Sequence, residues 1–243
     1  MQWSFVLFAP LHFLGHPCIV SGLGMTHVKT PWLGRRTVIT GMSISATALL
    51  LPAASLAQVK LIATPRQTEG PFYPVEWNGD VDADLVQVRG EAAQAMGQIA
   101  HVGGRIIDVS SQPIAGAIVE IWQCDANGIY RHPHDGGGAR SRDRRFQGRG
   151  RAISDASGRY SFRTIRPVAY PGRAPHIHFK VVLPDRRVLV TQMYIFGEAQ
   201  NERDGVLNSI RDQRQRDRVV VRLVAADGIE ARALTGTFDI VVG

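Results

Sequence analysis

Apolar and polar positions alternate in short runs along the second half of the chain, and β-branched residues are frequent in these runs. Alternation with a period of two is typical of strands that bury one face. Clusters of turn-forming residues separate the runs, as in Ser110-Ser111-Gln112-Pro113. The pattern predicts strands over residues 102–109, 117–123, 160–165, 176–183, 188–196, 219–225 and 237–242. Short strands at such spacing favour an all-β fold, an antiparallel β-sandwich.

Other segments lack this alternation. Residues 64–83 are rich in proline, glycine and aromatic side chains and have no helical period, which predicts an extended N-terminal arm. Residues 91–100 fit a short turn or helix. Only residues 201–218 have a helical pattern, so we expect little helix.

Two segments of the chain resemble each other. Residues 124–130 and 154–160 share the pattern Asp-Ala-polar-Gly-x-Tyr. The glycine can supply the positive φ of a tight turn, and we expect each tyrosine to begin a new strand.

The first 57 residues have the features of an export signal. Arg35 and Arg36 precede a modestly apolar run over residues 39–51, and Ala54-Ser55-Leu56-Ala57 is a small-x-small cleavage sequence. The paired arginines resemble a twin-arginine signal, which predicts a periplasmic or exported protein. Met25 begins a leader of ordinary proportions and is an alternative start. The run is short and contains Gly41 and Pro52, which disfavours a membrane anchor, so we expect no stable membrane insertion after leader removal. We divide the chain into a leader (1–57), an N-terminal arm (58–100) and a β-sandwich domain (101–243).

Composition and charge add little to this division. Hydrophobic residues make up 44% of the chain, which is enough for a packed core. The net charge of +7 includes three basic residues of the leader, and many of the others lie in residues 140–151, which read as a solvated loop. Phe146 is the single aromatic residue in that stretch, and a stacking platform would need several, so we expect no nucleic-acid partner. Cys124 would be the only cysteine left after leader removal, which excludes an intramolecular disulfide.

The candidate chemistry lies in the sequence from Arg166 to Phe179. His176 and His178 are two apart in a predicted strand, so their imidazoles should point to the same face and could bind one metal ion. Tyr170 precedes them by a loop long enough to fold back over that site. A His-x-His pair alone is weak evidence, since strand histidines are often merely half-exposed. Another pair, His132 and His134, reads as loop residues.

Four motifs resemble those of intradiol ring-cleavage dioxygenases, in the order of that family. They are the arm segment Thr68-Glu69-Gly70-Pro71-Phe72-Tyr73-Pro74, the segment from Trp122 to His132, the stretch Tyr170-Pro171 to Phe179, and Val190-Thr191-Gln192-Met193-Tyr194. The resemblance implies a non-haem Fe(III) ion held by two tyrosines and two histidines. Carried over, these ligands are Tyr130, Tyr170, His176 and His178. Phenolate oxygen suits a hard Fe(III) ion better than thiolate does.

The resemblance also implies roles for other residues. A catechol-type diol and O₂ would be the substrates, and a muconate-type dicarboxylate the product. Tyr170 would be displaced and accept a proton. Arg173 would stabilise negative charge on the substrate, with Gln192 beside it. Gly70 and Pro71 would line the substrate pocket.

Two features leave the substrate and assembly open. Only two residues separate Tyr170 from Arg173, where protocatechuate dioxygenases have a longer insertion, and this puts the exact substrate in doubt. The chain also lacks the long helical N-terminal domain typical of catechol and hydroxyquinol dioxygenases, so that kind of dimer is disfavoured. Another homo-oligomer stays an open alternative.

Two other functions are compatible with parts of the sequence. The pattern over residues 102–123 also resembles transthyretin-like binding modules, although such a module would not need two tyrosines, two histidines and an arginine in this order. A zinc hydrolase would need an acidic base beside the histidine pair, and none is near in sequence.

Overall fold

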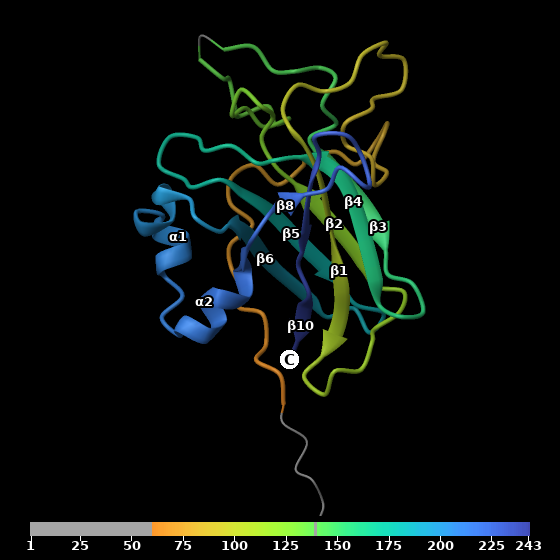
Figure 1. The fold of residues 1–243 in the computed structure, drawn as a ribbon, viewed down its shortest axis with the longest axis vertical. Coiled ribbons are helices and arrows are strands. Elements are labelled where there is room, and N and C mark those ends of the chain that lie inside the picture. The colour runs from red at the N-terminus through yellow and green to blue at the C-terminus, as the bar shows by residue number, and fades with distance from the viewer. Residues whose placement is uncertain (1–59, 139) are drawn as a thin grey trace, which may run out of the picture. The chain divides into compact units, whose positions relative to one another are not determined.

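Two five-stranded sheets form the frame of the computed structural model, which describes residues 60–138 and 140–243 (Figure 1). The predicted leader lies outside the described residues. The first sheet is built around β1 (Ile99–Asp108), which pairs with β4 (Arg159–Ile165) along one edge. The other strands of this sheet are β8 (Val224–Ala225), β9 (Leu234–Thr237) and β10 (Ile240–Val242).

The second sheet has the strand order β3-β2-β5-β6-β7. Its strands are β2 (Ile118–Trp122), β3 (Arg149–Ile153), β5 (His176–Val182), β6 (Val188–Ile195) and β7 (Val220–Val221). The pairs from β3 to β6 are antiparallel, with Trp122 opposite His178 and His178 opposite Gln192. This register determines which side chains of the three central strands share a face.

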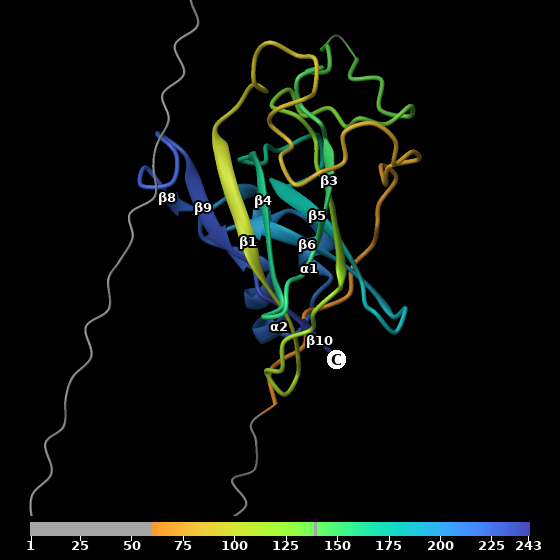
Figure 2. The same ribbon diagram turned by 90° about the vertical axis from the view of Figure 1, so that its right-hand side faces the viewer.

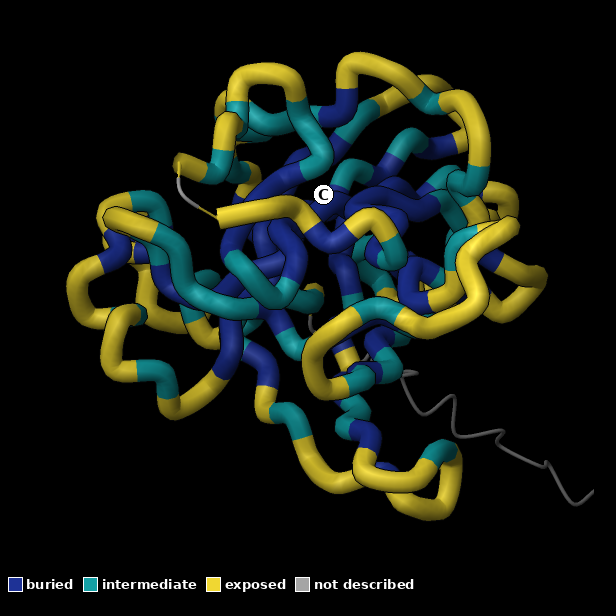
Figure 3. Tube along the Cα trace, turned by 90° about the horizontal axis from the view of Figure 1, so that it is seen from above, coloured by how far each residue is buried: buried dark blue, intermediate teal, exposed yellow. Residues whose placement is uncertain are grey.

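One hydrophobic cluster receives side chains from both sheets. Val102 and Phe162 come from the first sheet, and Ile121, Ile177 and Phe179 come from the second. The ring of Phe179 lies 6.1 Å from that of Tyr160 on β4, which brings the two sheets into contact. Seen from above, the buried parts of the trace gather in the centre and the exposed turns surround them (Figure 3). Burial of these apolar side chains is the main stabilising contribution to such a fold.

Helices are few and short in the described residues. They are the 3₁₀ helix η1 (Ala199–Glu202), α1 (Gly205–Asn208) and α2 (Gln213–Val219). The sequence predicted a single helical stretch here, but Ser209 to Asp212 interrupt it. No helix in the described part of the chain is long and apolar enough to cross a membrane.

Several predicted strands differ from those observed. The sheets are mixed rather than antiparallel, because β1 runs parallel to β9 and β10, and β6 runs parallel to β7. Predicted strand 219–225 is divided into β7 and β8, which belong to different sheets. Predicted strand 237–242 is interrupted at Phe238 and Asp239, because Thr237 ends β9 and β10 begins at Ile240. Residues 91–97, expected to form a short turn or helix, form bends instead, and Ile99 and Ala100 begin β1.

The arginine-rich stretch 140–151 is only partly the solvated loop that we expected. Its last residues begin β3, where Arg149 is 4% exposed and pairs with Trp122 of β2. Gly150 allows this packing, because a Cβ there would lie 2.5 Å from the carbonyl oxygen of Asp82. The sequence pattern did not predict this strand, because the buried positions of β3 are arginine and glycine rather than β-branched residues.

Residues 67–73, which we call the crossing segment, contact β6, β5 and β2 of the second sheet in turn, and they run beside that sheet in Figure 2. The amide of Gln67 donates to the carbonyl of Val190 on β6 over 2.8 Å, and Glu69 pairs with Lys180 on β5. Tyr73 then donates to Glu120 on β2 over 2.9 Å. Polar outer-face side chains of the sheet are thereby covered.

Candidate active site

The candidate site lies on the outer face of the second sheet, beneath the crossing segment. His176 and His178 alternate with Ile177 and Phe179 along β5, and the latter two belong to the shared core. Both histidines are nevertheless almost fully buried, at 1% and 2% exposure. Strand geometry therefore places two imidazoles side by side on one face.

The two imidazoles approach each other through their ε nitrogens. Nε2 of His176 lies 3.1 Å from Nε2 of His178 and 3.3 Å from the phenol oxygen of Tyr130. Nδ1 of His176 lies 2.6 Å from the carbonyl oxygen of Ala174, so this nitrogen carries the proton and Nε2 presents a lone pair. Two imidazole nitrogens and one phenol oxygen, all atoms that can bind a metal ion, thus lie close together.

Both histidines are neutral at ordinary pH. Burial, followed by the charge of Arg173, lowers the pKa of His176 to about 4. Burial, followed by neighbouring His176, lowers the pKa of His178 well below its usual value. Neutral imidazoles are the form that binds metal ions.

The ring of His178 is held between two neighbours. The indole of Trp122 stacks on it, with ring centroids 4.7 Å apart and planes at 10°. On another side lies Gly70, where a Cβ would come within 3.4 Å of Cε1 of His178. Gly70 also has a φ of 72°, which favours glycine. The predicted pocket residue Gly70 therefore contacts the site, while its neighbour Pro71 is exposed.

Tyr130 reaches the site from the turn that follows β2. Gly128 has the positive φ expected for this turn, and its amide donates to the carbonyl of Asp125 over 2.9 Å. The amide of Tyr130 donates to Asp135 over 2.8 Å, and Phe72 stacks on its ring. No strand begins at Tyr130, unlike at Tyr160, where the matching segment leads into β4.

Tyr170 lies on a tight turn before β5. The amide of Arg173 donates to the carbonyl of Tyr170 over 2.9 Å, and Gly172 has a φ of 82°. Pro171 and Gly172 are the residues that a type II turn favours at its two central positions. The ring of Tyr170 lies 5.6 Å from those of Tyr130 and His176. The structure therefore brings all four predicted ligands together.

The environments of the two tyrosines differ. Burial raises the pKa of Tyr130 well above the usual phenol value. Burial also raises the pKa of Tyr170, but the guanidinium of Arg173 opposes this rise. Tyr130 is 2% exposed, whereas Tyr170 is only half-buried. Both would be neutral phenols unless a cation stabilised the phenolate.

Arg173 connects the site to its surroundings. Its Nη1 lies 3.4 Å from the phenol oxygen of Tyr170, and its Nη2 donates to Oε1 of Gln192 over 2.6 Å. Its Nε donates to the buried carboxylate of Asp204 over 2.9 Å. The guanidinium is thereby fixed in orientation beside the candidate ligands.

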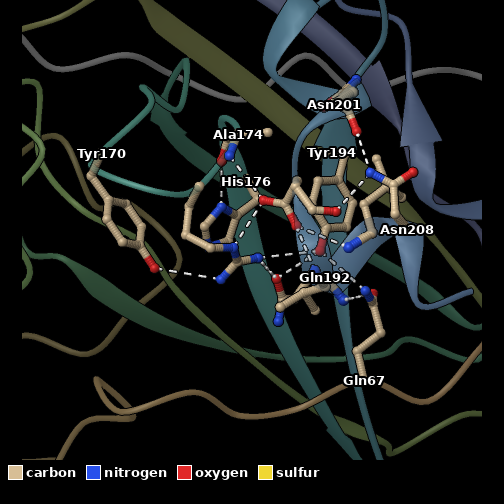
Figure 4. Close-up of polar contacts among 12 residues, drawn as sticks. Gln67, Tyr170, Ala174, His176, Gln192, Tyr194, Asn201 and Asn208 are labelled. Carbon is tan, nitrogen blue, oxygen red and sulfur yellow. Dashed lines mark hydrogen bonds and ion pairs between the residues drawn. The ribbon is translucent and has the colours of Figure 1, made fainter.

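Gln192 is fully buried in the same polar network (Figure 4). Besides Arg173, its Oε1 accepts from Tyr194 over 3.0 Å, and its Nε2 donates to the carbonyl of Thr68 over 3.0 Å. Gln67 donates to the hydroxyl of Tyr194 over 3.1 Å. Gln192 therefore joins Arg173 to the crossing segment.

The sequence did not indicate several residues of this network. Asp204 accepts from Arg173 and from the amide of Ala174, 2.9 Å each, and also caps α1. An aspartate before a helix was a readable cap signal, but its contacts 30 residues away were not. Gln67 and Tyr194 likewise meet only after folding.

The remaining candidates lie apart from the donors. His134 is exposed, and His132 touches the edge of Phe72 with ring centroids 5.7 Å apart. Cys124 is buried, and burial raises the pKa of its thiol to about 12. In residues 60–138 and 140–243, no group of three His, Cys, Asp or Glu side chains is placed to hold a metal ion.

Comparison with known proteins assigns the chain to a family. A family model described as dioxygenase matches residues 68–243. The protocatechuate 3,4-dioxygenase beta chain of Burkholderia cepacia is 36% identical over 187 residues, covering 73% of this chain and 78% of that protein. A hydroxyquinol 1,2-dioxygenase of Rhodococcus opacus is 31% identical, covering 74% of this chain and 60% of that enzyme.

A solved structure gives the same answer. The dioxygenase domain of a carbohydrate-binding fusion protein from Streptomyces sp. SirexAA-E is 29% identical, with a TM-score of 0.58, and covers 74% of this chain and 98% of that one. These matches favour a ring-cleaving enzyme over a transthyretin-like binding module. The chain belongs to the intradiol ring-cleavage dioxygenases, oxidoreductases that open catechol-type rings with O₂.

Proposed function

We propose that Tyr130, Tyr170, His176 and His178 hold a non-haem Fe(III) ion and that the enzyme cleaves a small catechol between its two hydroxyl-bearing carbons. The observation that carries this proposal is that Nε2 of His178 and the phenol oxygen of Tyr130 both lie within 3.3 Å of Nε2 of His176, with Tyr170 beside them.

The donor set fits Fe(III). Two neutral imidazoles and two phenols can bind a hard cation once the phenols ionise, and a bound cation lowers the pKa of its ligands. Zinc in proteins is bound by Cys, His, Asp and Glu, so the two tyrosines of this set disfavour a zinc site of the hydrolytic kind. Bound Fe(III) would supply a Lewis acid that makes a bound catechol reactive toward O₂.

The two tyrosines are suited to different tasks. Tyr130 is buried, its amide is held by Asp135, and Phe72 stacks on its ring, so it is a fixed ligand. Tyr170 is half-buried on a turn, and its hydroxyl contacts Arg173 at 3.4 Å. We propose that Tyr170 moves and accepts a proton from the entering diol.

Arg173 has the position and charge to stabilise negative charge on the substrate. Its planar guanidinium is permanently charged and is held by Asp204 and Gln192 before any substrate enters. Such preorganised charge favours an anionic transition state without reorganisation. Gln192 serves mainly to orient Arg173.

The substrate proposal rests on the shape and charge of the pocket. Gly70 and Pro71 would form one wall, where the absence of a Cβ at Gly70 leaves room for a ring. The short turn from Tyr170 to Arg173 would leave the pocket open, so substituted catechols could also react. Arg173 favours a ring that bears a carboxylate. Protocatechuate is therefore the first compound to test, with O₂ as the second substrate.

The remaining proposals concern architecture and location. We propose that the two sheets form a sandwich, with residues 67–73 of the predicted arm lying across the outer face of the second sheet, whereas the last two residues of that arm, Ile99 and Ala100, belong to β1. The paired arginines Arg35 and Arg36 support export by a twin-arginine-type route to the periplasm. Cell fractionation of the wild type and of an Arg35→Lys/Arg36→Lys double variant would test export. We expect the wild type in the periplasm and the variant absent from it, and an equal periplasmic amount of both would contradict the proposal.

Oxygen uptake with product analysis tests the proposed reaction. Catechol, protocatechuate and hydroxyquinol are supplied separately, and each product is examined by mass spectrometry. We expect O₂ consumption with at least one diol, and a dicarboxylate that contains both oxygen atoms. A yellow semialdehyde, which arises by cleavage outside the diol carbons, would refute the assignment, as would no uptake with any diol.

A further inference from the structure

A second polar feature of the molecule borders Tyr130 but lies outside the donor set. It is a cavity of about 400 Å³ between the segment around Glu76, the loop after Tyr130 and the start of β3. Four arginines line it, namely Arg131, Arg140, Arg142 and Arg149. We refer to it as the arginine cavity.

The cavity carries more positive than negative charge. Its four guanidinium groups face only two carboxylates, Glu76 and Asp135. Both oxygens of Asp135 already accept hydrogen bonds, from the amides of Tyr130 and Gly137. Across residues 60–138 and 140–243, none of the four arginines forms an ion pair with a carboxylate.

Arg149 is the most unusual member of this cluster. It is 4% exposed, and its Nη2 donates to the carbonyl of Asn78 over 2.8 Å. Its Nε is buried and has no hydrogen-bond partner among the described residues. A buried guanidinium N–H without an acceptor is unfavourable, because folding removes the water that accepted its hydrogen bond and supplies no protein acceptor in its place.

The other arginines leave donors available as well. Arg131 makes one long contact, 3.5 Å from Nη1 to the carbonyl of Gln147, and Arg142 is exposed at the rim. Arg140 is already engaged with the carbonyl of Asn127. Burial, and then the charge of Arg131, lowers the pKa of both Arg142 and Arg149, so the like charges oppose one another.

We propose that the arginine cavity binds a small oxyanion, a carboxylate or a phosphate, between Arg131, Arg142 and Arg149. An oxyanion in the cavity would be attracted by the three guanidinium charges and would relieve the repulsion among them. Guanidinium groups match the planar or tetrahedral oxygens of these anions and bind them by charge-assisted hydrogen bonds. The oxyanion is either a carboxylate carried by the aromatic substrate or a free ion.

Titration calorimetry with inorganic phosphate tests this site on the purified holoenzyme, without turnover. We expect one phosphate per chain with a Kd on the order of 1 mM or tighter. Arg142→Gln, at the exposed rim, should raise that Kd about tenfold or more, because it removes a charged donor. Arg149→Gln should raise the Kd for phosphate in the same way if the variant folds. If it does not fold, the Arg142→Gln variant still decides the test.

The matched control is Arg144→Gln, which removes the same charge from an exposed position of the same segment outside the cavity wall. Phosphate affinity should be unchanged in this variant. An equal loss in Arg144→Gln would mean general electrostatic attraction and would overturn the site. No binding tighter than about 10 mM, or binding that is indifferent to Arg142→Gln, would also overturn it.

Inhibition kinetics then distinguish the two sources of the oxyanion. If the cavity takes the carboxylate of the substrate, phosphate should raise the KM for protocatechuate and leave that for catechol unchanged. If it takes a free oxyanion, phosphate should bind without changing either KM. A rise in both values that persists in Arg142→Gln would place phosphate at the diol site and overturn the proposal. Because calorimetry needs no activity, failure of this proposal is distinguishable from failure of the proposed reaction.

Discussion

The two faces of the second sheet are made by alternate residues of the same strands, yet they are held in place by different interactions. On the inner face of β5, Ile177 and Phe179 pack into the core shared with the first sheet. On the outer face, His176 and His178 lie under a segment that crosses the sheet and are fixed by hydrogen bonds and ring stacking. Because the side-chain period is two, the register that buries the core also sets the site.

This comparison implies a separation of effects. A change on the inner face should weaken the fold and leave the chemistry of the folded molecules intact. A change on the outer face should remove metal or activity and leave the fold intact.

The largest effect on the chemistry should come from His178→Ala. It removes a proposed ligand, so iron affinity should fall by more than the roughly 10–100-fold typical of losing a supporting contact. Iron per chain and thermal unfolding of the metal-free protein would be measured together. A variant that retains full iron and full activity would show that the ligand set is wrong.

Phe179→Ala is the inner-face counterpart, one residue away. Phe179 is fully buried, and its ring lies 5.0 Å from that of Phe238. Its truncation should lower the free energy of unfolding by about 3–5 kcal/mol. Urea denaturation gives this value, and iron per folded chain should stay at the wild-type level. Loss of iron from well-folded Phe179→Ala would contradict the separation of faces.

Tyr170→Phe should retain iron but turn over slowly. The variant keeps the ring and removes the proposed proton acceptor, so kcat should fall on the order of 100-fold. Tyr160→Phe is the matched control, since Tyr160 is a buried tyrosine of β4 whose hydroxyl donates to the carbonyl of Phe238. That variant should lose stability and keep its kcat. Wild-type kcat in Tyr170→Phe would exclude the role of Tyr170.

Asp204→Asn should disturb the chemistry through Arg173. Asparagine caps helices about as well as aspartate, so α1 should persist, but the charge partner of Arg173 is lost. A charge-assisted hydrogen bond of this kind implies a fall in kcat of about tenfold or more, with little change in KM. Asp212→Asn, which alters the exposed cap of α2, should have no effect on either. Equal kcat values in the two variants would show that Asp204 does not position Arg173.

The smallest effect concerns the first sheet, far from the donors. Hydrogen bonds from Arg163, and then from His101, lower the pKa of Glu230 from 4.5 to about 2. The stabilisation that this implies is complete above pH 4.5 and is lost as the pH falls toward 2. Glu230→Gln should therefore remove part of the acid sensitivity, by no more than about 1 kcal/mol because the pair is partly exposed to solvent. Urea unfolding of the wild type and of Glu230→Gln at pH 5 and pH 3 would measure this. The same change in the free energy of unfolding between the two pH values in both proteins would contradict the prediction.

The sequence predicted those parts of the molecule whose determinants are local. The alternation over residues 176–183 correctly gave a strand, and the shared face of His176 and His178 followed from it. The turn glycines Gly128 and Gly158 have the positive φ that the repeated pattern required.

Other parts depend on contacts between distant segments. β3 is stabilised by pairing with β2 and by close packing at Gly150, which no periodicity reveals. β9 was missed because Leu234-Thr-Gly-Thr237 is short and polar, although it pairs in parallel with β1. Asp204 and Gln67 meet Arg173 and Tyr194 only in the folded chain. Tertiary contacts of this kind leave no trace in local propensity.

The most direct measurement of the central proposal is metal analysis of the purified protein with its visible absorption spectrum. Two tyrosinates bound to Fe(III) give ligand-to-metal charge transfer in the visible region, so we expect about one iron per chain and a red to burgundy colour. A colourless protein that contains zinc, or one that binds no iron when it is supplied, would contradict the assignment of Tyr130, Tyr170, His176 and His178.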